Sequence, residues 1–352
     1  MNARRNLRNK LTGLVFGVLA IGLMSLVGCG GHEDPWKHVE GEGKHVLVSF
    51  PPLFCFAKNV TGDHAKVMTL LTTVGPHDYT PSAHDAVKVT HADIFIVNGM
   101  GLDTKLYKLA NTSGNPEYRN NKEKFLLEVA SVFKPAEDKK AHMEDPTATT
   151  LIKFGHHGHE HGDHAHHHHH DSEWDPHVWL GVSQAKVMVD EICKKLSDLD
   201  PDNADHFKKN AETYKARLDK EVQQYGEEKL KPFENRNLVS MHESLKYFAR
   251  SFGLNVVDSI QAQPGVTADA KRIAKLIEDC KKAEVQVITV EPQYSDSVAK
   301  ELQKQLKGKV RIALVDTMET VDAKDATDAD YYITTMRKNI DNLAAAFANK
   351  KK

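Results

Sequence analysis

The chain has 352 residues, of which 40% are hydrophobic and 27% are charged. Its 47 Lys and Arg residues are balanced by 49 Asp and Glu residues, and the formal net charge of −2 argues against a nucleic-acid partner, which would require a basic face. The length is sufficient for two domains, each with its own buried core.

The N-terminus has the layout of an export signal. Basic residues precede an uncharged run, rich in Leu, Val, Ile and Gly, from Leu11 to Val27. The run is almost long enough to cross a bilayer, so an uncleaved membrane anchor is the alternative. However, Leu26-Val27-Gly28-Cys29 resembles the bacterial lipoprotein box. This resemblance implies a signal peptide at residues 1–28 and a mature protein that is exported and anchored to the cell membrane through lipid on Cys29, on the periplasmic or cell-surface side.

Residues 29–44 are charged, contain glycine and show no apolar periodicity. This composition predicts a flexible tether, with folding beginning near His45.

Six short β-rich runs, each bounded by turn residues and followed by a helical pattern, form two groups along the chain. The first group is 45–49, 65–71 and 94–98, and the second is 238–240, 285–290 and 310–315. Strands that alternate with helices predict parallel sheets flanked by helices. We therefore expect an α/β protein with two lobes, residues 45–182 and residues 201–352.

Between the two groups, residues 183–200 predict one long, rigid helix that joins the lobes. Apolar residues recur there at three- and four-residue spacing, and Asp200-Pro201 closes the segment. A second amphipathic helix is expected from Asn203 to about Tyr225, and a terminal helix from about Asp328 to Phe347.

Apart from Cys29, three cysteines remain, Cys55, Cys193 and Cys280, so at most one disulfide can form within the chain. Cys193 and Cys280 lie at helical core spacing, and we interpret both as buried hydrophobic side chains. The sequence does not fix which two of the three cysteines pair, if any do.

Open parallel sheets bind their ligands beyond the carboxyl ends of the strands. His77 follows the predicted strand 65–71, His242 follows 238–240, Glu291 follows 285–290 and Asp316 follows 310–315. His177 lies in a turn stiffened by Pro176, just before the predicted joining helix. Imidazoles and carboxylates gathered at this edge indicate a metal site.

A second group of histidines lies in one low-complexity segment, residues 156–170. Near neutral pH most of these imidazoles, with a reference pKa of about 6.5, are uncharged and able to bind metal. We expect an auxiliary metal-binding loop without fixed geometry; a disordered insertion or an engineered tag is the alternative. Its ten histidines are His156, His157, His159, His161, His164, His166, His167, His168, His169 and His170.

Four segments together resemble the ligand segments of the zinc/manganese-binding proteins of ABC importers, the cluster A-I family. They are Gly75-Pro76-His77-Asp78-Tyr79, Asp175-Pro176-His177-Val178-Trp179-Leu180, His242-Glu243-Ser244-Leu245-Lys246-Tyr247-Phe248 and Val315-Asp316-Thr317. The likeness covers essentially the whole chain after the tether. It implies two α/β lobes joined by a rigid helix, a metal ion in the cleft between them, and delivery of that ion to a membrane permease.

By position, the resemblance implies His77, His177 and His242 as imidazole ligands and Asp316 as the fourth ligand. Glu291 is the alternative ligand, or a residue that supports the ligands from outside the set, and a water molecule is a further candidate for the fourth position. Three imidazoles and one carboxylate suit tetrahedral Zn²⁺, whereas Mn²⁺ prefers more oxygen ligands. Manganese-carrying relatives frequently have Glu at the position of His242, so zinc is favoured as the cargo, with manganese as the alternative.

Binding and delivery without catalysis is therefore the expected function, by a monomer whose partners are the permease of an ABC importer and the membrane. A secreted zinc hydrolase with Glu243 or Glu291 as base is less favoured, because the sequence lacks His-Glu-x-x-His and a fourth protein ligand excludes a catalytic water. A role as a surface adhesin has no discriminating residue in the sequence.

Overall fold

The computed structural model describes residues 34–134, 150–153, 173–261, 264–266 and 268–348. The fold below is that of the unit Pro35–Lys352. The predicted signal peptide, Cys29 and the histidine-rich segment 156–170 lie outside the described residues. Within the described ranges, no helix combines the length and apolarity that crossing a membrane requires.

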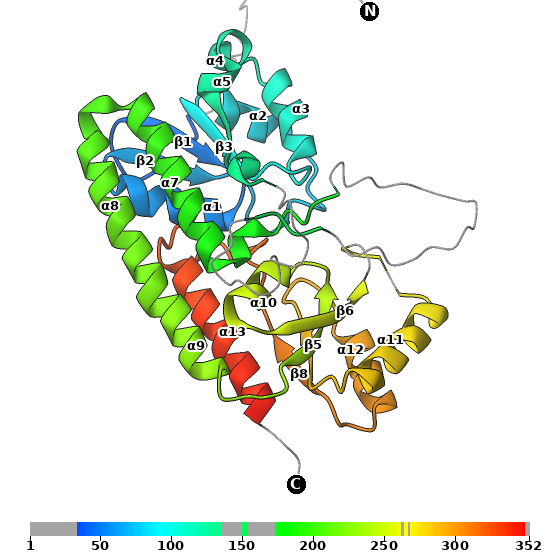
Figure 1. The fold of residues 1–352 in the computed structure, drawn as a ribbon. Helices are drawn as coiled ribbons and strands as arrows, with labels where there is room; N and C mark the ends of the chain where they lie inside the picture. Colours follow the sequence, from blue (N-terminus) through cyan, green and yellow to red (C-terminus); the bar gives the residue numbers. More distant parts are fainter. Residues whose placement is uncertain (1–33, 135–149, 154–172, 262–263, 267, 349–352) are drawn as a thin grey trace, which may run out of the picture. The chain divides into compact units, whose positions relative to one another are not determined.

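The N-terminal lobe is built on a four-stranded parallel sheet with the strand order β2-β1-β3-β4 (Figure 1). β3 and the last three residues of β1 are buried apolar runs, as expected of parallel strands that are covered on both faces. The strands are β1 (Lys44–Val48), β2 (Ala65–Thr69), β3 (Ile94–Val97) and β4 (Leu126–Glu128). The helices are α1 (Pro51–Thr61), α2 (Ala83–Thr90), α3 (Thr104–Thr112), α4 (Pro116–Asn120) and α5 (Lys122–Phe125), followed by the 3₁₀ turn η1 (Val129–Val132).

The C-terminal lobe repeats this arrangement with a second four-stranded parallel sheet of order β6-β5-β7-β8. The strands are β5 (Asn237–His242), β6 (Asn255–Gln261), β7 (Val287–Val290) and β8 (Arg311–Leu314). The helices of the lobe are α10 (Lys246–Phe252), α11 (Ala270–Lys282) and α12 (Ser297–Gln305). Two parallel sheets flanked by helices confirm the predicted fold class.

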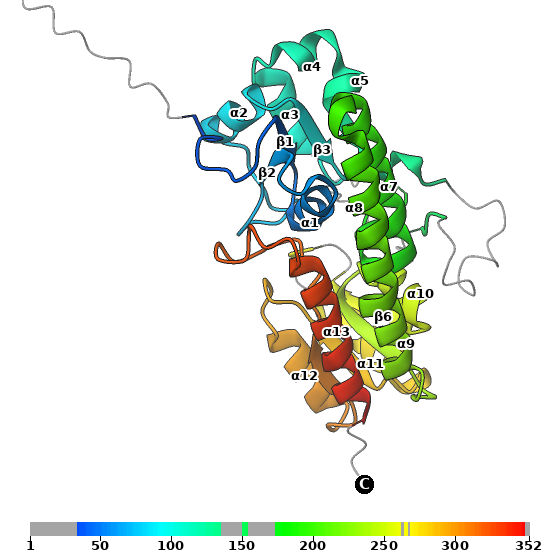
Figure 2. The same cartoon turned by 90° about the vertical axis from the view of Figure 1, so that its left-hand side faces the viewer.

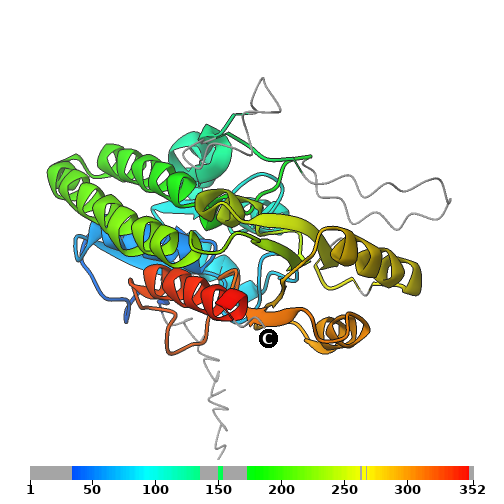
Figure 3. The same ribbon diagram turned by 60° about the horizontal axis from the view of Figure 1, so that its bottom comes forward.

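A layer of long helices connects the two lobes (Figures 2 and 3). α7 (Val182–Leu199) ends at the predicted Asp200-Pro201 turn, where η3 (Pro201–Asn203) reverses the chain. The chain then continues through α8 (Ala204–Arg217), the π-helical segment η4 (Leu218–Gln224) and α9 (Tyr225–Leu230). α8 packs on α1 of the N-terminal lobe, whereas α9 packs on α10 and on the terminal helix α13 (Tyr331–Ala348).

The helix predicted at residues 183–200 corresponds to α7, which forms a helical hairpin with the segment from α8 to α9. α7 contacts both α1 and α10, but the segment that leads into the second sheet is α8 to α9. The predicted helix from Asn203 to Tyr225 ends within this longer segment.

The hydrophobic core follows the alternation of side chains along the strands. Leu238 and Val287 face the larger cluster, which also contains the N-terminal sheet and residues of α7, α8 and α13. Their neighbours Val239 and Ile288 face a smaller cluster beneath α11 and α12. Because successive side chains of a strand point to opposite faces, the second sheet is covered on both sides.

The predicted tether differs from the structure over residues 35–43, which pack against the N-terminal lobe. Trp36 is fully buried, its ring stacks on that of His45 at a centroid distance of 4.5 Å, and its carbonyl accepts a hydrogen bond of 3.0 Å from Lys66 Nζ. A single buried tryptophan creates no periodic pattern, so the sequence does not reveal this contact.

Three cysteines lie within the described residues. Cys55, Cys193 and Cys280 are all buried and free. The interpretation of Cys193 and Cys280 as hydrophobic core residues is confirmed, since both side chains belong to hydrophobic clusters. Burial raises the pKa of the Cys55 thiol to about 12 and that of Cys280 to about 11.

Candidate metal site

His77 is presented by the loop that follows β2. The amides of Asp78 and Tyr79 both donate to the carbonyl of Gly75, at 3.2 and 3.1 Å, which closes a turn around Pro76 and His77. Pro and Gly favour such a turn, as the sequence indicates. The side chain of His77 is 10% exposed and is the most accessible of the candidate ligands.

His177 lies directly before η2 (Val178–Leu180) and is almost completely buried. Asp175 Oδ1 accepts hydrogen bonds from the backbone amide of His177 at 3.0 Å and from His177 Nδ1 at 2.6 Å. The turn itself is fixed from both lobes: Asn98 Nδ2 donates to Pro176 O, and Tyr247 Oη donates to Asp175 O. The ring of His177 is therefore held in one orientation.

His242 is the last residue of β5 and is also almost completely buried. Its Nδ1 lies 2.6 Å from Glu291 Oε1, and Glu291 Oε2 accepts from Gln293 Nε2 at 2.9 Å and from Thr317 Oγ1 at 3.2 Å. Glu291 thus contacts the ring edge of His242 that faces away from the other histidines. This position corresponds to the supporting role that the sequence left open for Glu291.

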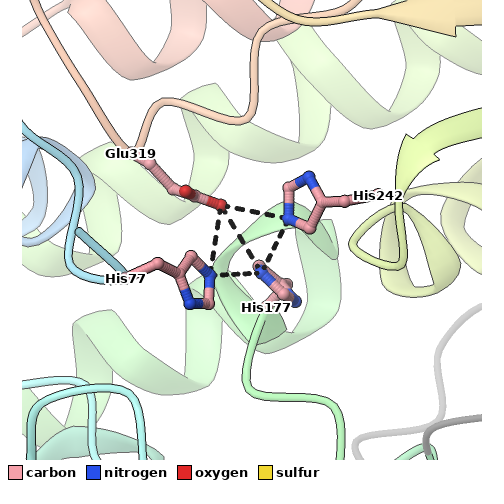
Figure 4. A group of neighbouring side chains, drawn as sticks. All are labelled: His77, His177, His242 and Glu319. Carbon is pink, nitrogen blue, oxygen red and sulfur yellow. Dashed lines mark hydrogen bonds and ion pairs between the residues drawn. The ribbon is translucent and has the colours of Figure 1, made fainter. Parts of the chain in front are cut away.

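The fourth group in the cluster is Glu319, which lies in the loop between β8 and α13 (Figure 4). The structure does not bring Asp316 to the histidines, in contrast to the sequence-based expectation. Asp316 Oδ1 accepts the amide of Met318 at 2.7 Å, and Oδ2 lies 3.2 Å from Tyr331 Oη. The carboxylate of Asp316 therefore folds back on its own loop, and the turn that it closes carries Glu319 to the site instead.

The signal for Glu319 was weak, because it stands in Thr317-Met318-Glu319-Thr320, beyond the segment that carries the resemblance. Met318 has a positive φ of 61°, so the backbone reverses between Asp316 and Glu319. Glu319 lies five residues after the end of β8 at Leu314 and reaches the site only because of this reversal, which no spacing rule predicts.

The four side chains point toward a common centre. His177 Nε2 lies 3.4 Å from His77 Nε2 and 3.2 Å from His242 Nε2. Glu319 Oε1 lies 3.8 Å from Nε2 of His77 and 3.4 Å from Nε2 of both His177 and His242. A tetrahedral zinc ion with bonds of 2.0–2.1 Å requires ligand atoms about 3.3 Å apart. Four of these five separations lie within about 0.1 Å of that value, and the distance from His77 Nε2 to Glu319 Oε1 exceeds it by about 0.5 Å.

Hydrogen bonding also prepares the site for a cation. A carboxylate only accepts, so in the neutral imidazoles Nδ1 of His177 and of His242 carries the proton, and both Nε2 lone pairs face the centre. Among the described residues, no hydrogen-bond partner reaches the buried Glu319 Oε1. The lone pairs of these nitrogen and oxygen atoms face one another in a buried space, where they repel. A cation bound between them removes this repulsion.

The acidic residues shift the pKa values in a consistent direction. Burial alone would lower the pKa of His177 and of His242. However, Asp175 and Glu319 raise the pKa of His177, and Glu291 and Glu319 raise that of His242, so both lie above the ordinary value. Burial would raise the pKa of Glu319, yet the three histidines hold it well below its ordinary value. Glu319 is therefore ionised, and a metal ion competes with protons for the imidazoles.

Several known zinc-binding proteins are similar to this chain. The zinc-binding protein AdcA of Streptococcus pyogenes serotype M3 (strain ATCC BAA-595 / MGAS315) is 30% identical over 318 residues, which cover 87% of this chain and 57% of that protein. The high-affinity zinc uptake system protein ZnuA of Bacillus subtilis (strain 168) is 27% identical over 328 residues, which cover 93% of this chain and 95% of that protein. The chain thus spans little more than half of the streptococcal relative.

A solved structure of the SBP FpvC from Pseudomonas aeruginosa in complex with Mn²⁺ has the same fold, with a TM-score of 0.71 at 21% identity over 88% of this chain and 100% of that chain. A family model described as "ZnuA: Zinc-uptake complex component A periplasmic" matches residues 46–346, which include both lobes and all four clustered side chains. The chain therefore belongs to the family of the periplasmic zinc-uptake complex component A.

Proposed function

We propose that this protein captures one Zn²⁺ ion with His77, His177, His242 and Glu319 and delivers it to the permease of an ABC importer. The observation that carries the proposal is the set of four ligand atoms, which lie within 4.8 Å of one another and point to a common centre, as a tetrahedral ion requires. Family membership supports the same role. Three nitrogen donors and one carboxylate favour zinc over manganese as cargo, because manganese prefers more oxygen ligands.

The same geometry favours reversible binding over catalysis. A tetrahedral ion with four protein ligands has no open position at which to activate water. The alternative of a zinc hydrolase would require one of the four to dissociate, and Glu291, its candidate base, is already bonded to His242 Nδ1.

We further propose that the protein is exported, anchored through Cys29 and monomeric, and that the histidines of residues 156–170 bind metal loosely near the site. Lipoprotein names among similar proteins, such as the zinc-binding lipoprotein AdcA of Streptococcus pneumoniae (strain ATCC BAA-255 / R6), support the anchor. Mass spectrometry of the N-terminal peptide from the native membrane tests it: a diacylated Cys29 is expected, and an intact Met1 would refute it.

Zinc titration against a competing chelator tests the central function. We expect one tight site in the whole chain, lost when His77, His177 and His242 are replaced together by Ala. Weaker sites should persist in that variant and disappear when residues 156–170 are deleted. Tight binding of one zinc ion by the triple variant would refute the assignment.

A further inference from the structure

The loop that carries Glu319 is held in place through Asp316. The backbone amide of Asp316 donates to Asn339 Oδ1 at 2.8 Å, and the carbonyl of Asp316 accepts from Asn339 Nδ2 at 2.8 Å. Asn339 lies on α13 and is 1% exposed. The backbone of Asp316 is therefore fixed to a buried helix side chain on both its donor and its acceptor side.

The side chain of Asp316 then shapes the turn. Its Oδ1 accepts the amide of Met318, two residues further on, at 2.7 Å, which is the pattern of an Asx turn. This contact stabilises the positive φ of 61° at Met318, a conformation that a residue with a side chain rarely adopts. Tyr331 Oη lies 3.2 Å from Asp316 Oδ2 and 3.2 Å from Thr320 O, so one hydroxyl connects the residues on either side of Glu319.

The site leaves little freedom on the opposite side of Glu319. A Cβ atom at Gly75 would lie 3.3 Å from Glu319 Cβ, which is closer than most such contacts. The amide of Val321 donates to Thr72 O at 2.8 Å, so the loop is also attached to the segment that leads to His77. Glu319 is held between this segment and the turn that Asp316 closes. A tetrahedral metal site tolerates errors of only a few tenths of an ångström.

We infer that Asp316 is a positioning residue that sets the fourth ligand of the metal site: its side-chain oxygen holds the turn that delivers Glu319. The inference rests on the proposed function, since it takes Glu319 as a zinc ligand. Without the Asp316 contact the turn relaxes, and the bound ion keeps three imidazole ligands with water in place of Glu319. Both the zinc affinity and the preference for four-coordinate ions then decrease. Asp316 acts through Glu319 and not through its own charge.

This distinction determines the test. Asp316→Ala removes the acceptor for Met318, whereas Asp316→Asn retains a side-chain oxygen at the same place and removes the charge. Asp322→Ala is the matched control, because Asp322 is an exposed acidic residue of the same loop. Each variant of the full chain is loaded with at most one equivalent of Co²⁺, and its visible absorption and its zinc affinity by chelator competition are measured.

We expect Asp316→Ala to weaken zinc binding by about 10- to 100-fold, the usual effect of residues that orient metal ligands, and to replace the strong tetrahedral cobalt spectrum with a weaker one. Asp316→Asn and Asp322→Ala should stay within about threefold of the unmodified protein. The double variant Asp316→Ala/Glu319→Ala should bind no more weakly than Glu319→Ala alone, because the two residues act in series.

Equal losses in Asp316→Asn and Asp316→Ala would overturn the inference, because the charge of Asp316 would then matter, as it does for a direct ligand. Additive losses in the double variant would also overturn it. If Asp316→Ala fails to fold by circular dichroism, Tyr331→Phe replaces it; a weakened cobalt band supports the inference, and an unchanged spectrum overturns it. Unchanged zinc binding by Glu319→Ala would instead refute the proposed ligand set, whatever the Asp316 variants do.

Discussion

Substitution of Glu291 tests how much the zinc affinity depends on residues that contact the ligand histidines but do not themselves bind the ion. Its Oε1 accepts from His242 Nδ1 at 2.6 Å, and the residue is 3% exposed. Glu291→Ala leaves a buried N–H unpaired, which costs about 1–3 kcal/mol, and frees the ring to rotate. If that cost falls on the metal-bound state, zinc affinity decreases by about 10- to 100-fold.

The substitution Glu291→Gln separates orientation from charge. The amide oxygen still accepts from Nδ1, but the hydrogen bond is no longer charge-assisted, a difference of about 1 kcal/mol or roughly fivefold in affinity. Chelator competition on chains that lack residues 156–170 measures these affinities without contribution from the histidine-rich segment. Glu243→Gln is the control, since Glu243 adjoins His242 in sequence but pairs with Lys246.

Affinity within twofold of the unmodified protein in Glu291→Ala would refute this reasoning, because the contact would then contribute nothing to the site. An equal loss in Glu243→Gln would also refute it, since that would indicate a general effect of negative charge near the metal site.

Three further predictions concern other parts of the molecule. Trp36→Ala should destabilise the protein by about 3–5 kcal/mol in urea unfolding, as expected for a buried tryptophan, whereas a mere tether would give no change. Because acidic neighbours raise the pKa of His177 and His242, their protons must leave on metal binding; zinc affinity should therefore rise from pH 6 to pH 8, and calorimetry in buffers of different ionisation enthalpy should detect proton release. With Cys29 replaced by Ser, a thiol reagent at pH 8 should label no cysteine of the native protein and three after unfolding, since Cys55, Cys193 and Cys280 are buried.

Periodic patterns were sufficient to predict most of the fold. β3, β7 and the last three residues of β1 are short runs rich in buried apolar residues, and α7 shows a helical stripe that ends at Asp200-Pro201. The missed strands lack such patterns. β4 has only three residues, and β6 contains Asp258, whose buried carboxylate pairs with Arg272 at 2.6 Å. The partner that makes an acidic residue acceptable within a strand is distant in sequence and invisible to a local pattern.

In the candidate site, too, local sequence patterns indicate some residues and miss another. His77 lies in the loop after β2, His242 ends β5, and His177 follows Pro176 in a turn, so the sequence could indicate all three. The carboxylate could not be assigned in this way, because Asp316 and Glu319 lie in one loop and a backbone reversal at Met318 decides which of them reaches the histidines. Such a reversal depends on contacts with α13, which the sequence does not show.

Zinc K-edge X-ray absorption of the full chain loaded with one equivalent of Zn²⁺ tests the central claim most directly. We predict a four-coordinate ion at 2.0–2.1 Å with three imidazole nitrogens and one carboxylate oxygen. The oxygen contribution should change to that of water, or disappear, in Glu319→Ala and remain in Asp316→Asn. Five or six ligands in the unmodified protein, or a spectrum unaffected by Glu319→Ala, would contradict the proposed site.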